Sequence, residues 1–345
     1  MKSIDELRAL SAMDPELHQL VEDGLVLPSS WNKDTDVHEV RALLAQIAKV
    51  HQEAGGASIK EEDRHIKTRD GAHIAVRLHH PPGLAPDKGG RPGMLMLHGG
   101  GFSIGDLNTG ARLSRIFAEL GGVAINVDFR LAPEHPFPRP VEDAYDALEW
   151  VSEHLESLGI DPVKGFVVAG ESSGANMALA VAYLWVTQNT GSSLRITGIY
   201  ASANSGATAE TVPEKYKDSF ISMEQNADAP VMNTEAIERI REFYKPDPKS
   251  PLAYPILIQD VSIMPRVYFQ ACGLDSTRDC TLVMEKVWRD AGVPTRLDVY
   301  PGMPHVFWAL GLPPIEQINK QEEDTKKGLS WLMSWCGGIV YKDED

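Results

Sequence analysis

The stretch that decides the fold is AGESSGANMAL, residues 169–179, in which two serines stand between glycines. It follows an apolar run that ends at Val168 and precedes a segment rich in helix-forming residues, which predicts a sharp turn from a buried strand into a helix. Gly170 and Gly174 remove the Cβ atoms that would collide in such a turn. The turn would expose the Ser172 hydroxyl at a helix N-terminus as a nucleophile. The alternative is an ordinary tight turn with an N-capping serine.

Short apolar runs alternate with helical stretches over most of the chain, and this rhythm predicts an α/β fold with a mostly parallel sheet and helices on both faces. The predicted strands cover residues 94–97, 123–127, 166–169, 196–200, 267–271 and 296–300. The predicted helices cover residues 108–120, 140–157, 173–187, 279–291 and 320–336. In an open sheet of this kind the functional site lies at the carboxyl ends of the strands.

Three segments fall outside this rhythm. Residues 1–55 have helical apolar spacing, and the alternating runs 63–68 and 72–78 are joined by Arg69-Asp70-Gly71, which is a hairpin signal. Residues 205–260 are too long for a plain crossover between two strands, and long insertions of this kind are usually functional loops or lids.

These segments predict a domain organisation. We expect an α/β domain made of residues 56–204 and 261–345, with residues 1–55 and 205–260 forming a cap over the carboxyl edge of the sheet. The alternative is that the insertion is a solvated helical segment without a role. Four insertion residues suggest an apolar pocket under the cap: Phe220, Met223, Phe243 and Tyr244.

A run of three glycines follows the first predicted parallel strand, in the sequence His98-Gly99-Gly100-Gly101-Phe102. Such a run loses much chain entropy on folding and is expected where backbone N–H groups must approach a ligand atom closely. We expect the N–H groups of Gly100, Gly101 and Ser173 to form an oxyanion hole, with Gly99 shaping the loop. A phosphate-binding loop is the rival, but its G-x-G-x-x-G and G-K-[ST] patterns are missing from the sequence. We expect His98 to tie the loop down rather than to act as a base.

A serine hydroxyl needs a neighbouring base and an orienting acid to act as a nucleophile near neutral pH. Asp275 and His305 each follow a late predicted strand, so both are expected at the edge of the sheet where Ser172 emerges. Asp279 is the competing acid, but an N-cap role at the start of the next helix suffices for it. Asp298 alternates within a predicted strand and is expected to face solvent.

The composition excludes several classes of partner and cofactor. The 345 residues carry a formal net charge of −16, which disfavours nucleic acid and anionic membranes and favours a neutral or weakly polar small molecule. Cys272, Cys280 and Cys336 form no C-x-x-C pair and the histidines no H-E-x-x-H spacing, so we expect reduced thiols, no metal and no cofactor. We see no signal peptide and no apolar run of membrane-spanning length. We therefore expect a cytoplasmic protein, and a homodimer is left open.

The chain resembles the hormone-sensitive-lipase-like family of α/β-hydrolase esterases, which includes the plant carboxylesterases. The resemblance covers residues 64 to 310 and rests on HGGGF (98–102), FRLAPEHPFP (129–138), GESSG (170–174), GLDSTRD (273–279) and YPGMPHVF (300–307). It implies an α/β-hydrolase fold with a helical cap, a triad of Ser172, Asp275 and His305, and an oxyanion hole from the glycine run plus Ser173. The chain order Ser, Asp, His matches this family. Within FRLAPEHPFP, Glu134 and His135 are expected to be structural.

The expected activity is hydrolysis of small, largely apolar esters, with short acyl groups or acetylated metabolites as substrates, through an acyl-enzyme. One alternative is a lyase or cyclase acting on a natural product in the same pocket without an acyl-enzyme. The other is a non-catalytic small-molecule receptor. The presence of Ser172 favours hydrolysis over the first alternative, and the presence of His305 argues against the second.

Overall fold

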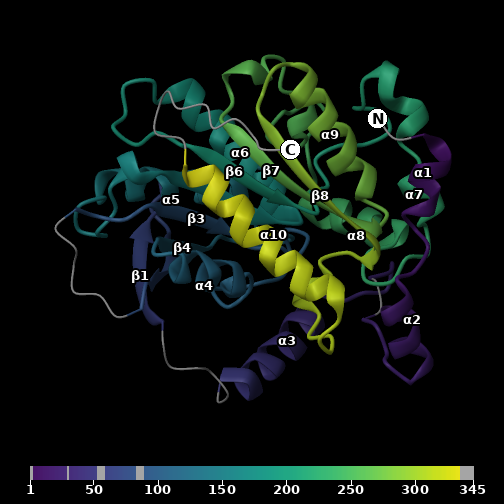
Figure 1. Cartoon of the computed structure of the whole chain (residues 1–345). Helices are drawn as coiled ribbons and strands as arrows, with labels where there is room; N and C mark the ends of the chain where they lie inside the picture. Colours follow the sequence, from purple (N-terminus) through teal and green to yellow (C-terminus); the bar gives the residue numbers. More distant parts are fainter. Residues whose placement is uncertain (1–2, 29–30, 53–58, 83–88, 335–345) are drawn as a thin grey trace.

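A computed structural model describes residues 3–28, 31–52, 59–82 and 89–334 of the chain (Figure 1). The described strands form an eight-stranded sheet in the spatial order β1-β2-β4-β3-β5-β6-β7-β8. In chain order the strands are β1 (Lys60–Lys67), β2 (His73–His80), β3 (Gly93–Leu97), β4 (Val123–Asp128), β5 (Phe166–Glu171), β6 (Gly198–Ser202), β7 (Arg266–Leu274) and β8 (Thr295–Pro304).

The strands from β4 to the β8 edge of this sheet pair in parallel, while β1 and β2 are antiparallel to their neighbours. The predicted hairpin is present, with Lys67 opposite His73 and a turn in which Gly71 has φ 88°. A residue without a Cβ adopts this left-handed conformation at little steric cost. The expected fold class, a mostly parallel sheet in an α/β protein, is confirmed.

Helices cover both faces of the sheet, as Figure 1 shows. Alternate side chains of β3 enter two separate cores: Leu95 and Leu97 lie in one, Met94 and Met96 in the other. The first core is covered by α5 (Arg139–Glu153), α6 (Ser173–Gln188) and α9 (Arg278–Asp290). The second is covered by α4 (Ala111–Glu119) and α10 (Glu316–Met333). This two-fold alternation is what a strand buried on both faces requires.

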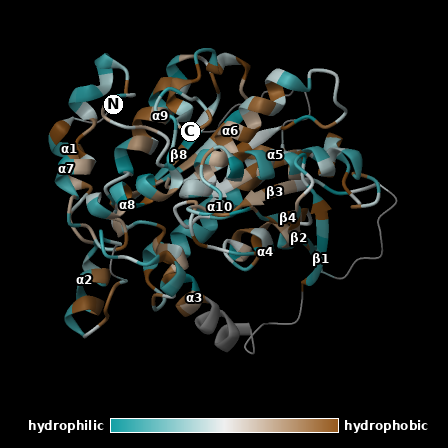
Figure 2. Ribbon diagram, turned by 180° about the vertical axis from the view of Figure 1, so that it is seen from behind, coloured by the Kyte–Doolittle hydropathy of each residue, from teal (hydrophilic) through white to brown (hydrophobic). Residues whose placement is uncertain are grey.

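The hydropathy of the strands matches how deeply each strand is buried. Figure 2 shows hydrophobic colour on the central strand β3 and hydrophilic colour on the edge strand β1. All five residues of β3 are buried, whereas β1 has one buried residue, Ile66. Charged side chains along an exposed edge also discourage pairing with another chain. Among the helices of the described ranges, none is both long and apolar enough to cross a membrane.

The N-terminal segment contains α1 (Ile4–Ala9), α2 (Pro15–Glu22) and α3 (Val37–Gln52). The loop between α1 and α2 is bound to the end of β8, because Gly302 N–H donates to Leu10 O at 2.8 Å and Asp14 N–H donates to Gly302 O at 3.2 Å. A Cβ on Gly302 would lie 2.2 Å from the Asp14 nitrogen, so this close approach requires glycine.

The insertion contains the short helix α7 (Ser222–Gln225) and the longer helix α8 (Thr234–Tyr244). It contacts the N-terminal segment directly. Lys33 N–H donates to Glu235 Oε1 at 3.0 Å, and Arg239 Nη2 donates to the Thr35 carbonyl at 3.0 Å. The two segments predicted to form one cap therefore contact each other.

Two predicted strands end later than expected, and this places the candidate site. β7 continues to Leu274 and β8 to Pro304, so Asp275 and His305 follow the two strands directly. The register of the β7–β8 pair shifts between Cys272 and Leu274, an irregularity that no periodicity in the sequence marks. Cys336 lies outside the described residues.

Candidate active site

Ser172 stands at the junction between β5 and α6 with φ 55° and ψ −122°. This backbone conformation is sterically unfavourable for a residue with a side chain and is held by its surroundings, including a 2.8 Å hydrogen bond from Ser172 N–H to Ser202 O. A Cβ on Gly170 would lie 2.1 Å from Gly174 O, and one on Gly174 would lie 2.0 Å from Leu97 O. Both glycines of the G-x-S-x-G pattern are thus required by close backbone packing.

The hydroxyl of Ser172 and the imidazole of His305 lie within hydrogen-bond distance, with 2.8 Å between Oγ and Nε2. The other ring nitrogen of His305, Nδ1, lies 2.7 Å from Asp275 Oδ2. All three side chains are buried. The arrangement places a hydroxyl, an imidazole and a carboxyl in series, which is the geometry that serine hydrolysis requires.

Thr277 holds the carboxylate of Asp275 from the opposite side. Asp275 Oδ1 accepts from Thr277 N–H at 2.8 Å and from Thr277 Oγ1 at 2.9 Å, which leaves Oδ2 for the imidazole of His305. None of the sequence motifs assigns a role to Thr277. An Asp followed two residues later by a hydrogen-bonding residue is a local turn signal that could have identified it.

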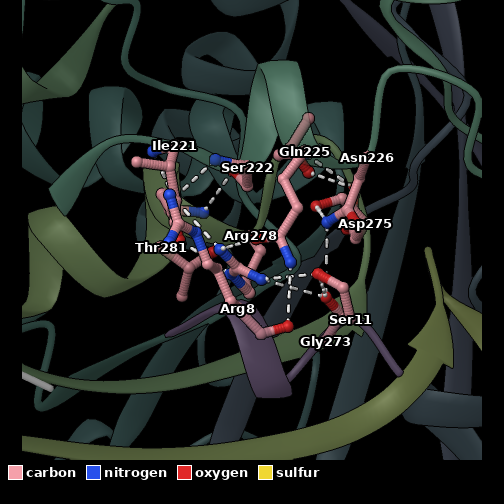
Figure 3. Close-up of polar contacts among 12 residues, drawn as sticks. Arg8, Ser11, Ile221, Ser222, Gln225, Asn226, Gly273, Asp275, Arg278 and Thr281 are labelled. Carbon is pink, nitrogen blue, oxygen red and sulfur yellow. Dashed lines mark hydrogen bonds and ion pairs between the residues drawn. The ribbon is translucent and has the colours of Figure 1, made fainter. Parts of the chain in front are cut away.

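A second supporting residue that the sequence pattern does not reveal comes from the insertion. Asn226 Nδ2 donates to the backbone carbonyl of Asp275 at 2.9 Å (Figure 3). It is almost fully buried and follows α7 in a segment with no regular pattern. No signal in the sequence indicates that this asparagine fixes the backbone of the candidate acid.

Asp279 plays a different part from the one expected. It was predicted as an N-cap of the helix that begins there, but α9 begins at Arg278. The Asp279 carboxylate instead accepts from the N–H groups of Ile221 and Ser222, each at 2.7 Å. The prediction was wrong because the free N–H groups that the carboxylate meets belong to the start of α7, which is distant in sequence.

Asp298, which the alternation predicts to face solvent, is partly exposed, and its Oδ2 also accepts from the Tyr268 hydroxyl at 2.6 Å. The neighbouring strand β7 brings Tyr268 alongside β8, so the alternation within one strand does not reveal this partner. The contact lies within the strand pairing and away from Ser172.

The glycine loop borders the serine. A Cβ on Gly99 would lie 3.2 Å from the Ser172 Cβ, and Gly101 and Ser173 line the pocket in front of the hydroxyl. Within the described residues, no hydrogen bond occupies the N–H groups of Gly100, Gly101 or Ser173. Gly100 and Gly101 have φ values of 120° and 60°, which glycine adopts readily. These N–H groups are therefore available to a ligand.

His98 lies beneath the loop. Its Nδ1 is 2.7 Å from the Gly99 carbonyl, and its ring stacks on Phe129 with 4.2 Å between centroids. Burial lowers the pKa of His98 to about 4, so the imidazole is neutral at physiological pH. These contacts fit a structural role for the ring.

The motif FRLAPEHPFP connects several parts of the site. Ala132 N–H donates to the Phe102 carbonyl at 2.9 Å, and Phe137 N–H donates to the Tyr244 carbonyl at 2.7 Å. Glu134 forms a 2.7 Å ion pair with Arg41 of α3. The motif thus links the glycine loop, the insertion and the N-terminal segment without reaching Ser172.

The pocket in front of Ser172 is partly open to solvent and is bounded largely by the insertion. From the α/β part the lining includes Phe102, Ser172, Ser173, Asn176, Thr277 and His305. From the insertion it includes Met232, Ile237, Ile240, Arg241, Tyr244 and Tyr254. Of the four insertion residues that suggested an apolar pocket, Tyr244 lines it, Phe220 and Phe243 pack on the core, and Met223 is partly exposed and outside the lining.

Glu171 is a buried carboxyl next to the candidate nucleophile, in a position that the G-x-S-x-G pattern leaves unspecified. Its Oε1 accepts from Trp308 Nε1 at 2.7 Å. Burial raises the pKa of Glu171, and the Trp308 hydrogen bond opposes that rise. The group does not contact the Ser172 hydroxyl through any hydrogen bond in the described structure.

Other reactive groups in the described ranges do not add to the site. No group of three or more His, Cys, Asp or Glu side chains among those residues could hold a metal ion. Cys272 and Cys280 are free and buried, and burial raises the pKa of both thiols, that of Cys280 to about 12. Neither thiol is activated as a nucleophile.

Comparison with known proteins decides the family. A family model described as the α/β-hydrolase fold matches residues 94–309. The chain belongs to the α/β-hydrolase fold family. This α/β-hydrolase is 34% identical to versiconal hemiacetal acetate esterase of Dothistroma septosporum, over 74% of this chain and 78% of the relative.

Solved structures agree with this assignment. A vibralactone cyclase matches the α/β-hydrolase with a TM-score of 0.85 at 30% identity, covering 96% of this chain and 97% of the other. An esterase of Pyrobaculum calidifontis matches with a TM-score of 0.77 at 26% identity, covering 93% and 99%. The expected resemblance to hormone-sensitive-lipase-like esterases is confirmed, and the α/β-hydrolase is an enzyme of the carboxylesterase type.

Proposed function

We propose that this α/β-hydrolase cleaves small carboxylic esters through an acyl-enzyme on Ser172. His305 takes the proton from the Ser172 hydroxyl as its oxygen attacks the ester carbonyl, and Asp275 orients the imidazole and stabilises its charge. His305 then gives the proton to the departing alcohol. Water activated by His305 cleaves the acyl-enzyme, releases the acid and restores the serine.

The oxyanion of each tetrahedral intermediate is bound by the N–H groups of Gly100, Gly101 and Ser173. That none of the three has an acceptor among the residues the structure describes supports this role, because donors fixed before the reaction need no reorganisation when charge develops. Gly99 allows the loop to approach the Ser172 Cβ. The single observation that carries the proposal is the 2.8 Å separation between Ser172 Oγ and His305 Nε2.

We also propose that residues 1–55 and 205–260 form a cap over an α/β domain made of residues 56–204 and 261–345. The contribution of the insertion to the pocket lining and its hydrogen bonds to the N-terminal segment support this division. A cytoplasmic location, a homodimer and the lack of a nucleic-acid partner stay predictions from the sequence.

Ester hydrolysis by the Ser172→Ala variant tests the assignment. With 4-nitrophenyl acetate or butyrate, we expect kcat to fall by about 10³-fold or more, because the nucleophile is lost. Ser173→Ala is the matched control, since it keeps the backbone N–H and should stay within a few-fold of the parent enzyme. Undiminished turnover by Ser172→Ala, or no labelling of the parent enzyme by a fluorophosphonate probe, would refute the proposal.

A cyclase reaction in the same pocket is the second candidate, and the likeness to vibralactone cyclase favours it. Such a reaction would proceed without an acyl-enzyme. Mass spectrometry of the protein quenched during turnover separates the two, because hydrolysis requires an acyl group on the peptide that contains Ser172.

A further inference from the structure

A cluster of hydrogen-bond donors interrupts the apolar lining of the pocket. Arg241 and Tyr244 lie three residues apart on α8 and both line the pocket, as does Tyr254, which precedes the 3₁₀ turn Pro255–Leu257. The neighbouring lining residues Ile237 and Ile240 are apolar. Residues three and four apart share one face of a helix, so this face of α8 presents both polar and apolar side chains to the pocket.

This face of α8 lies directly on the glycine loop. A Cβ on Gly101 would come within 2.7 Å of Ile240 Cγ1, and the Tyr244 ring stacks on Phe102 with 3.6 Å between centroids. The donor cluster is therefore close to the proposed oxyanion hole and bounds the same space as Ser172.

The Tyr244 hydroxyl is buried and has no hydrogen-bond partner in the part of the chain that the structure describes. The residue is 2% exposed. A buried hydroxyl without a partner is unfavourable by the free energy of its lost hydration, and this loss is recovered when a ligand accepts its hydrogen bond. Burial raises the pKa of the Tyr244 phenol, so the group keeps its proton and acts as a donor.

Arg241 supplies a positive charge to this part of the pocket. No carboxylate lies within ion-pair distance of Arg241 among the described residues, and the exposed Glu210, whose pKa is lowered first by Thr208 and also by Arg241, is the acidic neighbour of its guanidinium. Burial raises the pKa of Tyr254, and the adjacent Arg241 guanidinium opposes that rise. The three residues thus bring a guanidinium and two protonated phenols to the lining of the pocket, with no carboxylate of the described residues within ion-pair distance of Arg241.

We propose that Arg241, Tyr244 and Tyr254 bind a carboxylate on the substrate, so that the preferred ester is a short one that carries a second, free carboxylate. A planar guanidinium and two O–H groups match the four lone-pair directions of a carboxylate. Because the protein carries a net charge of −16, a cation in the pocket offsets the long-range repulsion that an anionic substrate would meet. This inference rests on the proposed ester hydrolysis and names its substrate class.

Two pairs of matched esters test the proposal and distinguish where the carboxylate lies. Mono-4-nitrophenyl glutarate and 4-nitrophenyl valerate differ by a carboxylate on the acyl side. Then 4-acetoxybenzoate and 4-methylphenyl acetate differ by a carboxylate on the alcohol side. We expect the enzyme to prefer the anionic ester in one of the two pairs. Preference for the neutral ester in both pairs would overturn the proposal.

The variant Arg241→Met removes the charge and keeps much of the packing. For the preferred anionic ester we expect kcat/KM to fall about 20-fold, mainly through a higher KM, with less than about a threefold change for its neutral partner. Arg241→Lys should recover part of the loss. Tyr244→Phe should lower kcat/KM for the anionic ester about fivefold relative to kcat/KM for its neutral partner. Equal effects of Arg241→Met on both esters of a pair would indicate a structural role and overturn the proposal.

Arg239→Met is the matched control on the same helix. Arg239 pairs with Glu242 and lies over the Phe243 ring, and it is outside the pocket lining. We expect it to leave the ratio between anionic and neutral esters unchanged.

Binding measurements test the proposed carboxylate subsite independently of the proposed ester hydrolysis. Calorimetry with the Ser172→Ala variant should show tighter binding of the anionic ester than of the neutral one, and adding Arg241→Met should abolish the difference. If the parent enzyme cleaves no ester, the hydrolysis is wrong and this measurement still decides the subsite. If neutral esters are cleaved and Arg241 makes no difference to binding, the subsite alone is wrong.

Discussion

The oppositely charged side chains of Arg278 and Asp279 lie 2.7 Å apart, and both are fully buried. Figure 3 shows Arg278 among residues from three separate segments. Its guanidinium donates to Ser11 Oγ at 2.9 Å, to Gly273 O at 3.4 Å and to Gln225 Oε1 at 3.3 Å. The pair therefore ties the N-terminal segment and the insertion to the strand end that carries Asp275.

Replacing Asp279 by Asn should destabilise the fold strongly. The substitution leaves the Arg278 charge buried without its partner, and breaking a buried ion pair in this way costs about 3 kcal/mol or more. Urea unfolding measures the change in the free energy of unfolding. The double variant Arg278→Met with Asp279→Asn should lose less than the single variant, since no unpaired charge is left. An unfolding midpoint for Asp279→Asn equal to that of the parent would contradict this account.

The substitution Gly174→Ala, which adds a Cβ atom, should lower kcat/KM strongly. The new Cβ would meet Leu97 O at 2.0 Å and displace the turn that carries Ser172. A displacement of about 1 Å at a reacting group lowers kcat/KM about 100-fold. Near-ultraviolet circular dichroism confirms that the measured protein is folded. Gly191→Ala is the control, because nothing lies within 4 Å of the Cβ it would add, and its activity should be unchanged.

Thr277→Val should lower kcat about tenfold and leave KM within about twofold, because it removes a hydroxyl donor to a charged carboxylate. Asp275 would keep the Thr277 N–H bond and its contact with His305, so activity should fall without vanishing. Thr277→Ser restores the hydroxyl and should recover most of the rate. Steady-state kinetics on 4-nitrophenyl butyrate check this. Equal rates for Thr277→Val and the parent would show that the hydroxyl does not support the acid.

The buried carboxyl of Glu171 should make the stability of the folded protein depend on pH. Its pKa in the folded protein is raised above the ordinary value of 4.5, so the folded state holds a proton that the unfolded chain releases above that pH. The stability contributed by this group is therefore complete below pH 4.5 and lost as pH rises toward the raised value. Glu171→Gln stays neutral and keeps an acceptor for Trp308.

The melting temperature of Glu171→Gln relative to the parent should therefore rise as pH increases above 4.5. Thermal unfolding between mildly acidic and neutral pH measures this trend. Glu224→Gln, at an exposed position, serves as the control and should show no comparable trend. A difference for Glu171→Gln that is constant over the range would contradict the buried, protonated carboxyl.

The sequence predicted the residues whose positions depend on local rules. Ser172, Asp275 and His305 each follow a parallel strand, and parallel strands bring their carboxyl ends to one edge. The turn at Gly170 to Gly174 is likewise a local steric requirement. For these positions a pattern along the chain contains the necessary information.

Residues of the insertion could not be placed in this way. Asn226, Arg241 and Tyr254 lie in a segment without a strand rhythm, and their neighbours are set by packing against distant parts of the chain. The same reason explains why the sequence does not reveal the partners of Asp279 and Asp298, which belong to other elements. A local capping preference, or the alternation of side chains within one strand, carries no information about partners on distant elements.

The groups assigned to bond cleavage come from the ends of sheet strands, whereas one face of α8 supplies much of the wall that a substrate would touch. The groups assigned to bond cleavage and the residues of this wall therefore lie on separate elements of the chain. Exchanging α8 for a helix with other inward side chains would then redirect substrate choice while conserving the chemistry, both in natural divergence and in laboratory redesign.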